Sequence, residues 1–174
     1  MVDQKSLPER DQEHIFMTVD GIEGEVNVED FSGTIAVREF NYTVELPLTT
    51  ERTRGGATRD KSIHSQAVIR KVADKSSVKL FQNCCEGTQL DEVKFEFIRF
   101  SQGEMVVART LTLSEVFVSR FKHLGEYPAD SDLPMEEIAF DFGTITDTYT
   151  QQKPDGSMSG NVEFGWDRLN GKAL

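Results

Sequence analysis

Alternation of apolar and polar residues, the pattern of a half-buried β-strand, runs through most of this chain and constrains its fold more than any other feature. In residues 14–20, for example, Ile15, Met17 and Val19 share one face. A longer β-rich run ends at Pro47, because proline cannot donate to a central ladder. We predict a mostly β protein with strands in residues 14–20, 33–46, 63–72, 90–100, 105–121, 135–150 and 160–167.

One segment has helical spacing instead. Asp74 is a favourable N-cap residue, and Gly87 is a natural C-terminal stop. Between them the apolar residues fall on one helical stripe, which consists of Val78, Phe81, Cys84 and Cys85. The pattern predicts one short helix that plugs or flanks the sheet, with its two cysteines as small apolar core residues.

Several predicted strands change the face on which their apolar residues lie. Phe97 and the residues before it alternate on one face, but Ile98 continues on the other. The same switch occurs between Leu113 and Val116, and again at Gly143. Two explanations stay open: β-bulges that shift the register, or strands that neighbouring copies cover on their second face.

The charge of the chain is strongly negative and unevenly spread. Lys and Arg number 19 and Asp and Glu 30, which gives −11 and argues against binding to nucleic acid or to an anionic membrane. Direct membrane insertion is not expected either. Residues 52–79 hold eight bases and two acids, a local +6. This segment begins in residues 49–61, which lack apolar periodicity and predict a long basic loop. The loop is either ordinary surface or a complement to an acidic face of another copy.

Compartment signals are few. The first dozen residues are polar, without the apolar core of a secretory signal, and no apolar stretch approaches the ~18 residues that span a bilayer. The only cysteines are adjacent, which is not a disulfide framework. We expect synthesis in the cytoplasm and, if the chain leaves the cell, export without a signal peptide.

No arrangement of residues indicates catalysis. His14, His64 and His123 are scattered without metal-ligand spacing. The cysteine pair lies at the C-terminal end of the predicted helix, where the dipole disfavours a thiolate. Adjacent acids such as Glu136 and Glu137 read as a solvated patch. We predict no catalytic residue, no metal and no cofactor, so the chain is not expected to be an enzyme.

Three blocks of sequence resemble one known family. They are Asp-Gly-Ile-x-Gly-Glu at residues 20–25, DKSSVKLFQNCCEG at 74–87 and YTQQKPDGSMSGNVEFGWD at 149–167. Their order and spacing are similar to those of the haemolysin-coregulated proteins, Hcp, which form the inner tube of the type VI secretion system of Gram-negative bacteria. The family-motif positions that carry the resemblance are Asp20, Gly21, Gly24, Asp74, Phe81, Cys84, Cys85, Tyr149, Gln151, Gln152, Gly165 and Trp166.

The resemblance implies a fold and an assembly. The fold would be a compact β-barrel of two packed antiparallel sheets with one short α-helix at its side and a long extended loop. The barrel domain would span residues 14–168, after a polar leader at 1–13 and before a tail at 169–174. Hexameric rings would stack into a tube that a contractile sheath propels, and effectors would travel in the lumen.

The resemblance also implies partners and an interface. The partners are other copies of the chain, the sheath, the spike and baseplate, and effector proteins. In the family an extended loop reaches a neighbouring copy, and the matching loop here is 48–62, with Leu48, Arg52, Arg54, Arg59 and Lys61. We hypothesise that its arginines meet acids among residues 126–137 of an adjacent copy.

Two readings from other classes remain. A stand-alone β-sandwich module that binds a small ligand or a peptide explains the strands and the lack of a catalytic set, but not the three matching blocks. A hydrolase with paired carboxylates is the third reading, and loss of activity on changing one acid would favour it. A monomer with a deep apolar pocket would favour the binding module.

Overall fold

The computed structural model describes residues 14–47, 61–101, 103–153 and 157–174, and in these ranges the chain is mostly β with one short helix, as predicted. The strands are β1 (Ile15–Val19), β2 (Ile35–Val37), β3 (Glu39–Asn41), β4 (Val44–Glu45), β5 (Ile63–His64), β6 (Ala67–Val72), β7 (Gln89–Ser101), β8 (Glu104–His123), β9 (Met135–Asp141), β10 (Thr144–Gln152), β11 (Met158–Asp167) and β12 (Lys172–Ala173). The helix α1 spans Ser76–Glu86. The predicted leader, residues 1–13, lies outside the described residues.

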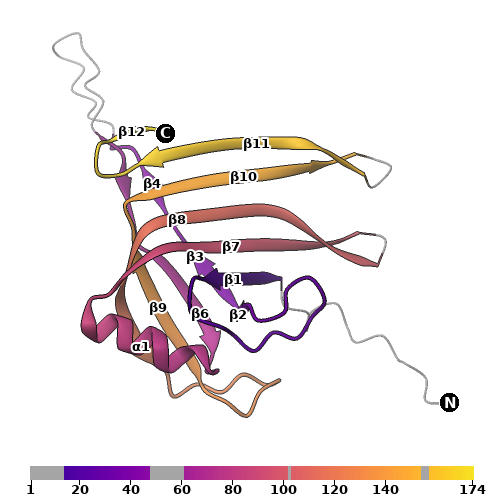
Figure 1. Ribbon diagram of the computed structural model, residues 1–174, viewed down its shortest axis with the longest axis vertical. Coiled ribbons are helices and arrows are strands. Elements are labelled where there is room, and N and C mark those ends of the chain that lie inside the picture. Colours follow the sequence, from indigo (N-terminus) through magenta and orange to yellow (C-terminus); the bar gives the residue numbers. More distant parts are fainter. Residues whose placement is uncertain (1–13, 48–60, 102, 154–156) are drawn as a thin grey trace, which may run out of the picture.

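Strand β8 joins two layers of one ten-stranded antiparallel sheet. Its first half pairs with β10 and its second half with β9, while β7 follows it along most of its length. Figure 1 shows β7, β8, β10 and β11 side by side across the upper half of the molecule, with β9, β6 and β3 crossing them at a steep angle. The two layers predicted from the sequence are therefore present, and they are continuous through β8. Strands β4 and β5 form a separate small hairpin.

The main core fills the space between these layers. Phe95 of β7 lies against Phe40 of β3 and Phe140 of β9, with ring centroids 4.8 and 6.1 Å apart. Met17 and Ile69 are fully buried in the same cluster. Burial of apolar area at this scale is the main favourable term in folding. The fold is therefore held by contacts between strands that are far apart in the sequence.

The changes of strand face arise within one copy. The pairing of β7 with β8 shifts between Phe97 and Ile98, which is a β-bulge. Glu115 has a φ of 55° at the point where β8 passes from β10 to β9, so the residues on both sides of it can turn into the core. Ile98 packs with Phe16 and Phe31 in a second cluster. Neighbouring copies are thus not needed to explain the pattern. The bulge interpretation is correct at Phe97, whereas the change at Gly143 is a break between β9 and β10.

The long β-rich run and the tail differ from the prediction. Residues 33–46 are not one strand but three short ones, β2, β3 and β4, and residues 135–150 are two, β9 and β10. Residues 172–173, placed in a tail by sequence, form β12 on the end of β11. Arg38 marks one break, since its N–H donates to the Arg70 carbonyl between β2 and β3. The chain turns there from one layer into the other.

The predicted buried stripe of the helix is wrong. α1 buries Ser76, Ser77, Leu80 and Asn83. Phe81 is 47 % exposed, Cys84 is half-buried against the core, and Cys85 is exposed. The helix is rotated because hydrogen bonds make it favourable to bury its serines. The N-cap position is Lys75 rather than Asp74, although the Asp74 carboxylate accepts the N–H of Ser76 at 2.9 Å.

A buried ion network fixes α1 to the sheet. Lys71 of β6 is fully buried, and its ammonium donates to Asp74 at 2.8 Å, Ser77 at 3.0 Å and Glu136 at 3.2 Å. The Ser77 hydroxyl also donates to Glu136 at 2.7 Å. Glu136 is only 3 % exposed, so the expectation of a solvated acidic patch at Glu136 and Glu137 is wrong for Glu136. A buried charge needs such partners.

Gly24 permits a close approach of two backbone segments. A Cβ at this position would lie 2.0 Å from the carbonyl oxygen of Thr34. We expect Gly24→Ala to lower the free energy of unfolding by ~1–3 kcal/mol, because rigid backbone must move. Gly125→Ala is the control, since its Cβ would meet no atom within 4 Å. Equal urea midpoints for the two variants would contradict this account.

Candidate functional site

The sheet extends beyond the core as an exposed apolar surface. Asp147 and Tyr149 of β10 pair with Phe164 and Val162 of β11, respectively, so alternate residues share one face. At the inner end this face is core, but further out Val162 is 70 % and Phe164 60 % exposed. We call this outer part the overhang, which consists of Arg109, Asp147, Tyr149, Val162 and Phe164. Its exposed apolar side chains, Tyr149, Val162 and Phe164, are of the kind that marks an interaction site.

The overhang ends in an open strand edge. β12 pairs with β11 only at Trp166 and Asp167, and the N–H of Leu174 bonds to the Gly165 carbonyl. Among the described residues, no strand pairs with the outer side of β11 from Met158 to Phe164. Exposed edges with apolar side chains are templates for pairing with another chain, and proteins normally protect them. This edge is therefore a second feature that suits assembly.

A groove lies between the overhang and the β4–β5 hairpin. Its volume is about 340 Å³, and it is lined by Tyr42, Val44, Ser62, His64, Arg109, Leu111, Ile145, Asp147, Phe164 and Trp166. The rings of His64 and Trp166 stack with centroids 6.1 Å apart, and Phe164 stacks on Trp166 at 6.3 Å. The walls are thus mainly aromatic and aliphatic, as in binding pockets.

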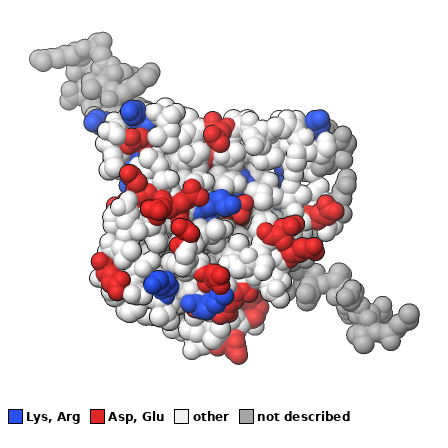
Figure 2. Space-filling view, viewed as in Figure 1, with Lys and Arg blue, Asp and Glu red and all other residues white. Residues whose placement is uncertain are grey.

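Polar groups inside the groove are satisfied by one another. Tyr42 Oη lies 2.5 Å from His64 Nδ1, and Ser62 Oγ lies 3.0 Å from His64 Nε2. Arg109 and Asp147 form a two-bond ion pair, in which Nε–Oδ1 is 2.8 Å, and the hydrogen bond raises the pKa of Arg109. The groove therefore carries little net charge. Figure 2 shows the opposite side of these strands, where acidic and basic residues are scattered among uncharged ones.

His64 links the hairpin to the sheet in a pH-dependent way. Burial, and next the positive charge of Arg168, lowers the pKa of His64. In the unfolded chain this imidazole titrates near about 6.5. Because the folded form binds the proton less readily, its contribution to stability is complete above that pH and is lost progressively below it.

We therefore expect acidification from pH 7.5 to pH 5 to destabilise the wild type more than His64→Gln. Urea midpoints at the two pH values measure the difference. The variant keeps His14 and His123, so the two proteins differ only at position 64. Equal pH dependence of the two proteins would show that His64 does not contribute.

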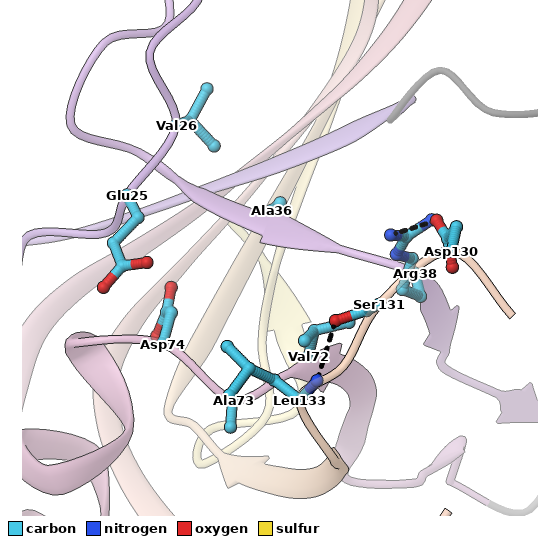
Figure 3. Close-up of a pocket in the computed structure, with 10 residues that line it drawn as sticks. All are labelled: Glu25, Val26, Ala36, Arg38, Val72, Ala73, Asp74, Asp130, Ser131 and Leu133. Atoms are coloured by element: carbon cyan, nitrogen blue, oxygen red, sulfur yellow. Dashed lines mark hydrogen bonds and ion pairs between the residues drawn. The ribbon is translucent and has the colours of Figure 1, made fainter. Parts of the chain in front are cut away.

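A smaller cavity lies near the start of α1 and is lined by residues of β2, β6 and two loops (Figure 3). Its volume is about 230 Å³. At one end Glu25 accepts the N–H of Lys75 at 3.0 Å, and at the other Arg38 pairs with Asp130 at 2.7 Å. These contacts attach the loops at 20–34 and 124–134 to the start of α1 and the end of β2. We therefore interpret the cavity as structural rather than as a binding site. The described residues contain no group of metal-ligating side chains.

The predicted loop interface is only partly visible. Leu48, Arg52, Arg54 and Arg59 lie outside the described residues, whereas Lys61 is described and exposed. Several of the acids suggested as its partners already pair within the chain. Besides Glu136, they are Asp130 with Arg38, Glu126 with Arg70, and Glu137 with Arg70 and Arg120.

The residues of the C-terminal block lie at the overhang. Trp166 packs against the main core, Tyr149 is 46 % exposed on the overhang, and Gly165 lies under Leu174. Gln152 donates to Ser101 at 2.5 Å, whereas Gln151 is exposed. Of the other motif positions, Asp20 is exposed and Gly21 has a φ of 72° in the first turn. Sequence reasoning missed Val162 and Phe164, although their alternation with Trp166 was a usable signal.

A comparison with protein families decides the identity of this fold. The family model described as "Type VI secretion system effector, Hcp" matches residues 16–149. The chain belongs to the Hcp family. The resemblance inferred from the three sequence blocks is thus confirmed, and with it a role in type VI secretion. Among curated proteins, a search found no match.

Solved structures of type VI secretion proteins have the same fold. "Structure of a type six secretion system protein" superposes with a TM-score of 0.85 at 23 % identity, over 94 % of this chain and 100 % of that one. Hcp1 from Salmonella typhimurium superposes with a TM-score of 0.73 at 19 % sequence identity, over 92 % of this chain and 98 % of that one. A type VI secretion system effector from Yersinia pestis superposes with a TM-score of 0.69 at 25 % sequence identity, over 88 % of this chain and 98 % of that one. Within its described residues, this Hcp chain has no helix long and apolar enough to span a bilayer.

Proposed function

We propose that this chain is a structural, non-enzymatic subunit of the type VI inner tube. Copies associate into hexameric rings, the rings stack, and a contractile sheath propels the tube towards a target cell. Membership of the Hcp family supports the assignment to the type VI secretion system. The exposed overhang and its open β11 edge support the association of identical copies. In a ring, an identical neighbour would bury the apolar side chains that now face water.

The other partners follow from the same role. We propose that the ring surface contacts the sheath, that the tube ends on the spike and baseplate, and that effectors are carried in the lumen. The chain is then made in the cytoplasm and exported by the machine to the extracellular space or the target cell. No cofactor is part of this proposal.

Electron microscopy of the purified full chain tests the assembly directly. We expect ring-shaped particles with an open centre, and stacks of them at higher protein concentration. Fields that contain only small single particles at every concentration would contradict the proposal. The same outcome would favour the second reading, a binding module, for which the groove of about 340 Å³ is the specific support.

Stacking of the rings should depend on the basic loop. With Arg52, Arg54 and Arg59 changed to Glu, we expect stacks to be lost while single rings persist, and the loss to be greatest at low salt. The control carries the same charge change at Lys94, Lys153 and Lys172. Exposed pairs are individually worth only ~0.2–1 kcal/mol, so their effect arises by repetition around a ring. Unchanged stacking would remove the role of the loop.

A further inference from the structure

The outward side of α1 carries an apolar stripe. Val78 is 75 % exposed, Phe81 is 47 % exposed, and Cys85 follows at helical spacing and is also exposed. The ring of Phe81 packs against those of Phe121 and His123, with ring centroids 5.6 and 5.8 Å apart. These contacts hold Phe81 in a fixed position on the helix surface. A helix on the surface of a soluble monomer normally presents polar residues on this side. The stripe is thus a convex apolar surface without cover from the described part of its own chain.

The groove beside the overhang is its concave counterpart. Its rim is apolar, since Val44 is 51 % and Phe164 60 % exposed, and its floor is formed by the buried side chains of Leu111 and Ile145. The volume of about 340 Å³ leaves room for an aromatic side chain. Because Arg109 is neutralised by Asp147, the groove favours an uncharged occupant. Figure 1 places α1 and β11 at opposite ends of the molecule.

A closed ring needs such a pair of surfaces. Head-to-tail association joins two different surfaces of the same chain, one from each neighbour, and closes when the rotation between them fits.

We propose that the α1 stripe of one copy docks in the groove of the next, with Phe81 entering between the hairpin and the overhang. This is recognition of an amphipathic helix by an apolar groove. The inference rests on the proposed function, because it describes how the copies of a ring meet. It assigns α1, which lies away from the open β11 edge, to the subunit contact.

Cross-linking through the native Cys85 tests this contact. In a Cys84→Ser background, Val44→Cys places a thiol on the groove rim, and a short bismaleimide is added to the assembled full chain. We expect dimers and higher covalent species up to a closed ring on a denaturing gel. Two controls are Val28→Cys, an exposed valine in the 26–34 loop, and Val44→Cys combined with Cys85→Ser. Neither control should form the ladder.

The outcomes separate this inference from the proposed function. If rings form by native mass but Val44→Cys cross-links no better than Val28→Cys, the α1 contact is overturned and the tube assignment stands. A ladder that persists without Cys85 also overturns it. If no rings form, both proposals fail. A ladder that requires both thiols, in protein that forms rings, supports the contact.

Discussion

Phe164→Glu is expected to yield a folded chain that no longer forms rings. In the monomer this side chain is 60 % exposed, so a carboxylate there remains hydrated and the fold is undisturbed. In a ring the carboxylate would be buried in an apolar contact, opposite Asp147 on the adjacent strand. Burying a charge without a partner costs several kcal/mol at every contact around the ring. The molar mass measured by light scattering after size-exclusion chromatography should therefore fall from that of the ring to that of one chain.

Phe164→Leu is the matched control, because it keeps an apolar group at the same place. Leu169→Glu is the second control, since Leu169 is 76 % exposed and lies outside the overhang. Both are expected to form rings. Circular dichroism should be the same for all the variants. Rings of unchanged mass from Phe164→Glu would show that the overhang is not the subunit contact.

Lys71→Ala is expected to lower the free energy of unfolding by ~3–5 kcal/mol, the largest effect of any single change considered for this chain. Lys71 is fully buried and is the cation that balances Glu136 and Asp74. Without it, the Glu136 carboxylate stays buried with only the Ser77 hydroxyl as a strong donor. Urea denaturation of the full chain measures the loss.

Lys75→Ala is the control for this prediction. Lys75 is four residues away and pairs with Glu23 at 3.2 Å, but both side chains are largely exposed. Such a pair contributes ~0–1 kcal/mol, so this variant should be close to wild type. The double variant Lys71→Met with Glu136→Leu should be more stable than Lys71→Ala, because it also removes the buried Glu136 carboxylate and leaves only the less buried Asp74. Similar losses for Lys71→Ala and Lys75→Ala would contradict the network.

Strands were the most predictable part of this fold. Alternation of residue types follows directly from the two faces of a strand, and it located the paired segments around Val93, Leu111 and Ile138. Breaks within the long runs were not predictable, because Arg38 and Gly143 interrupt strands through backbone contacts with residues distant in the sequence. The shift at Phe97 was visible as a change of face, and only the structure could decide its cause.

The orientation of the helix was mispredicted for a physical reason. Periodicity assumes that a helix buries its apolar side, but α1 buries serines because Lys71 and Glu136 hydrogen-bond to it. These two partners of Ser77 lie on strands β6 and β9, and no pattern within the helix reveals them. The apolar stripe at Val78 and Phe81 was real, but it faces outward. A stripe therefore indicates a contact without saying whether that contact lies in the same chain.

The candidate site was accessible to sequence reasoning only in part. The resemblance located the C-terminal block that ends in Trp166, whose ring forms part of the groove wall. It could not indicate that Phe164 and Val162, in the same strand, extend past the core. That depends on how far β10 and β11 continue beyond the layer beneath them.

Sedimentation of the purified full chain over a wide concentration range tests the central claim, that exposed strand and helix surfaces are buried against identical neighbours. The account predicts a hexamer as the main species at micromolar concentration, with larger assemblies as the concentration rises. A single species of about 19.6 kDa, the mass of one chain, throughout the range would contradict it.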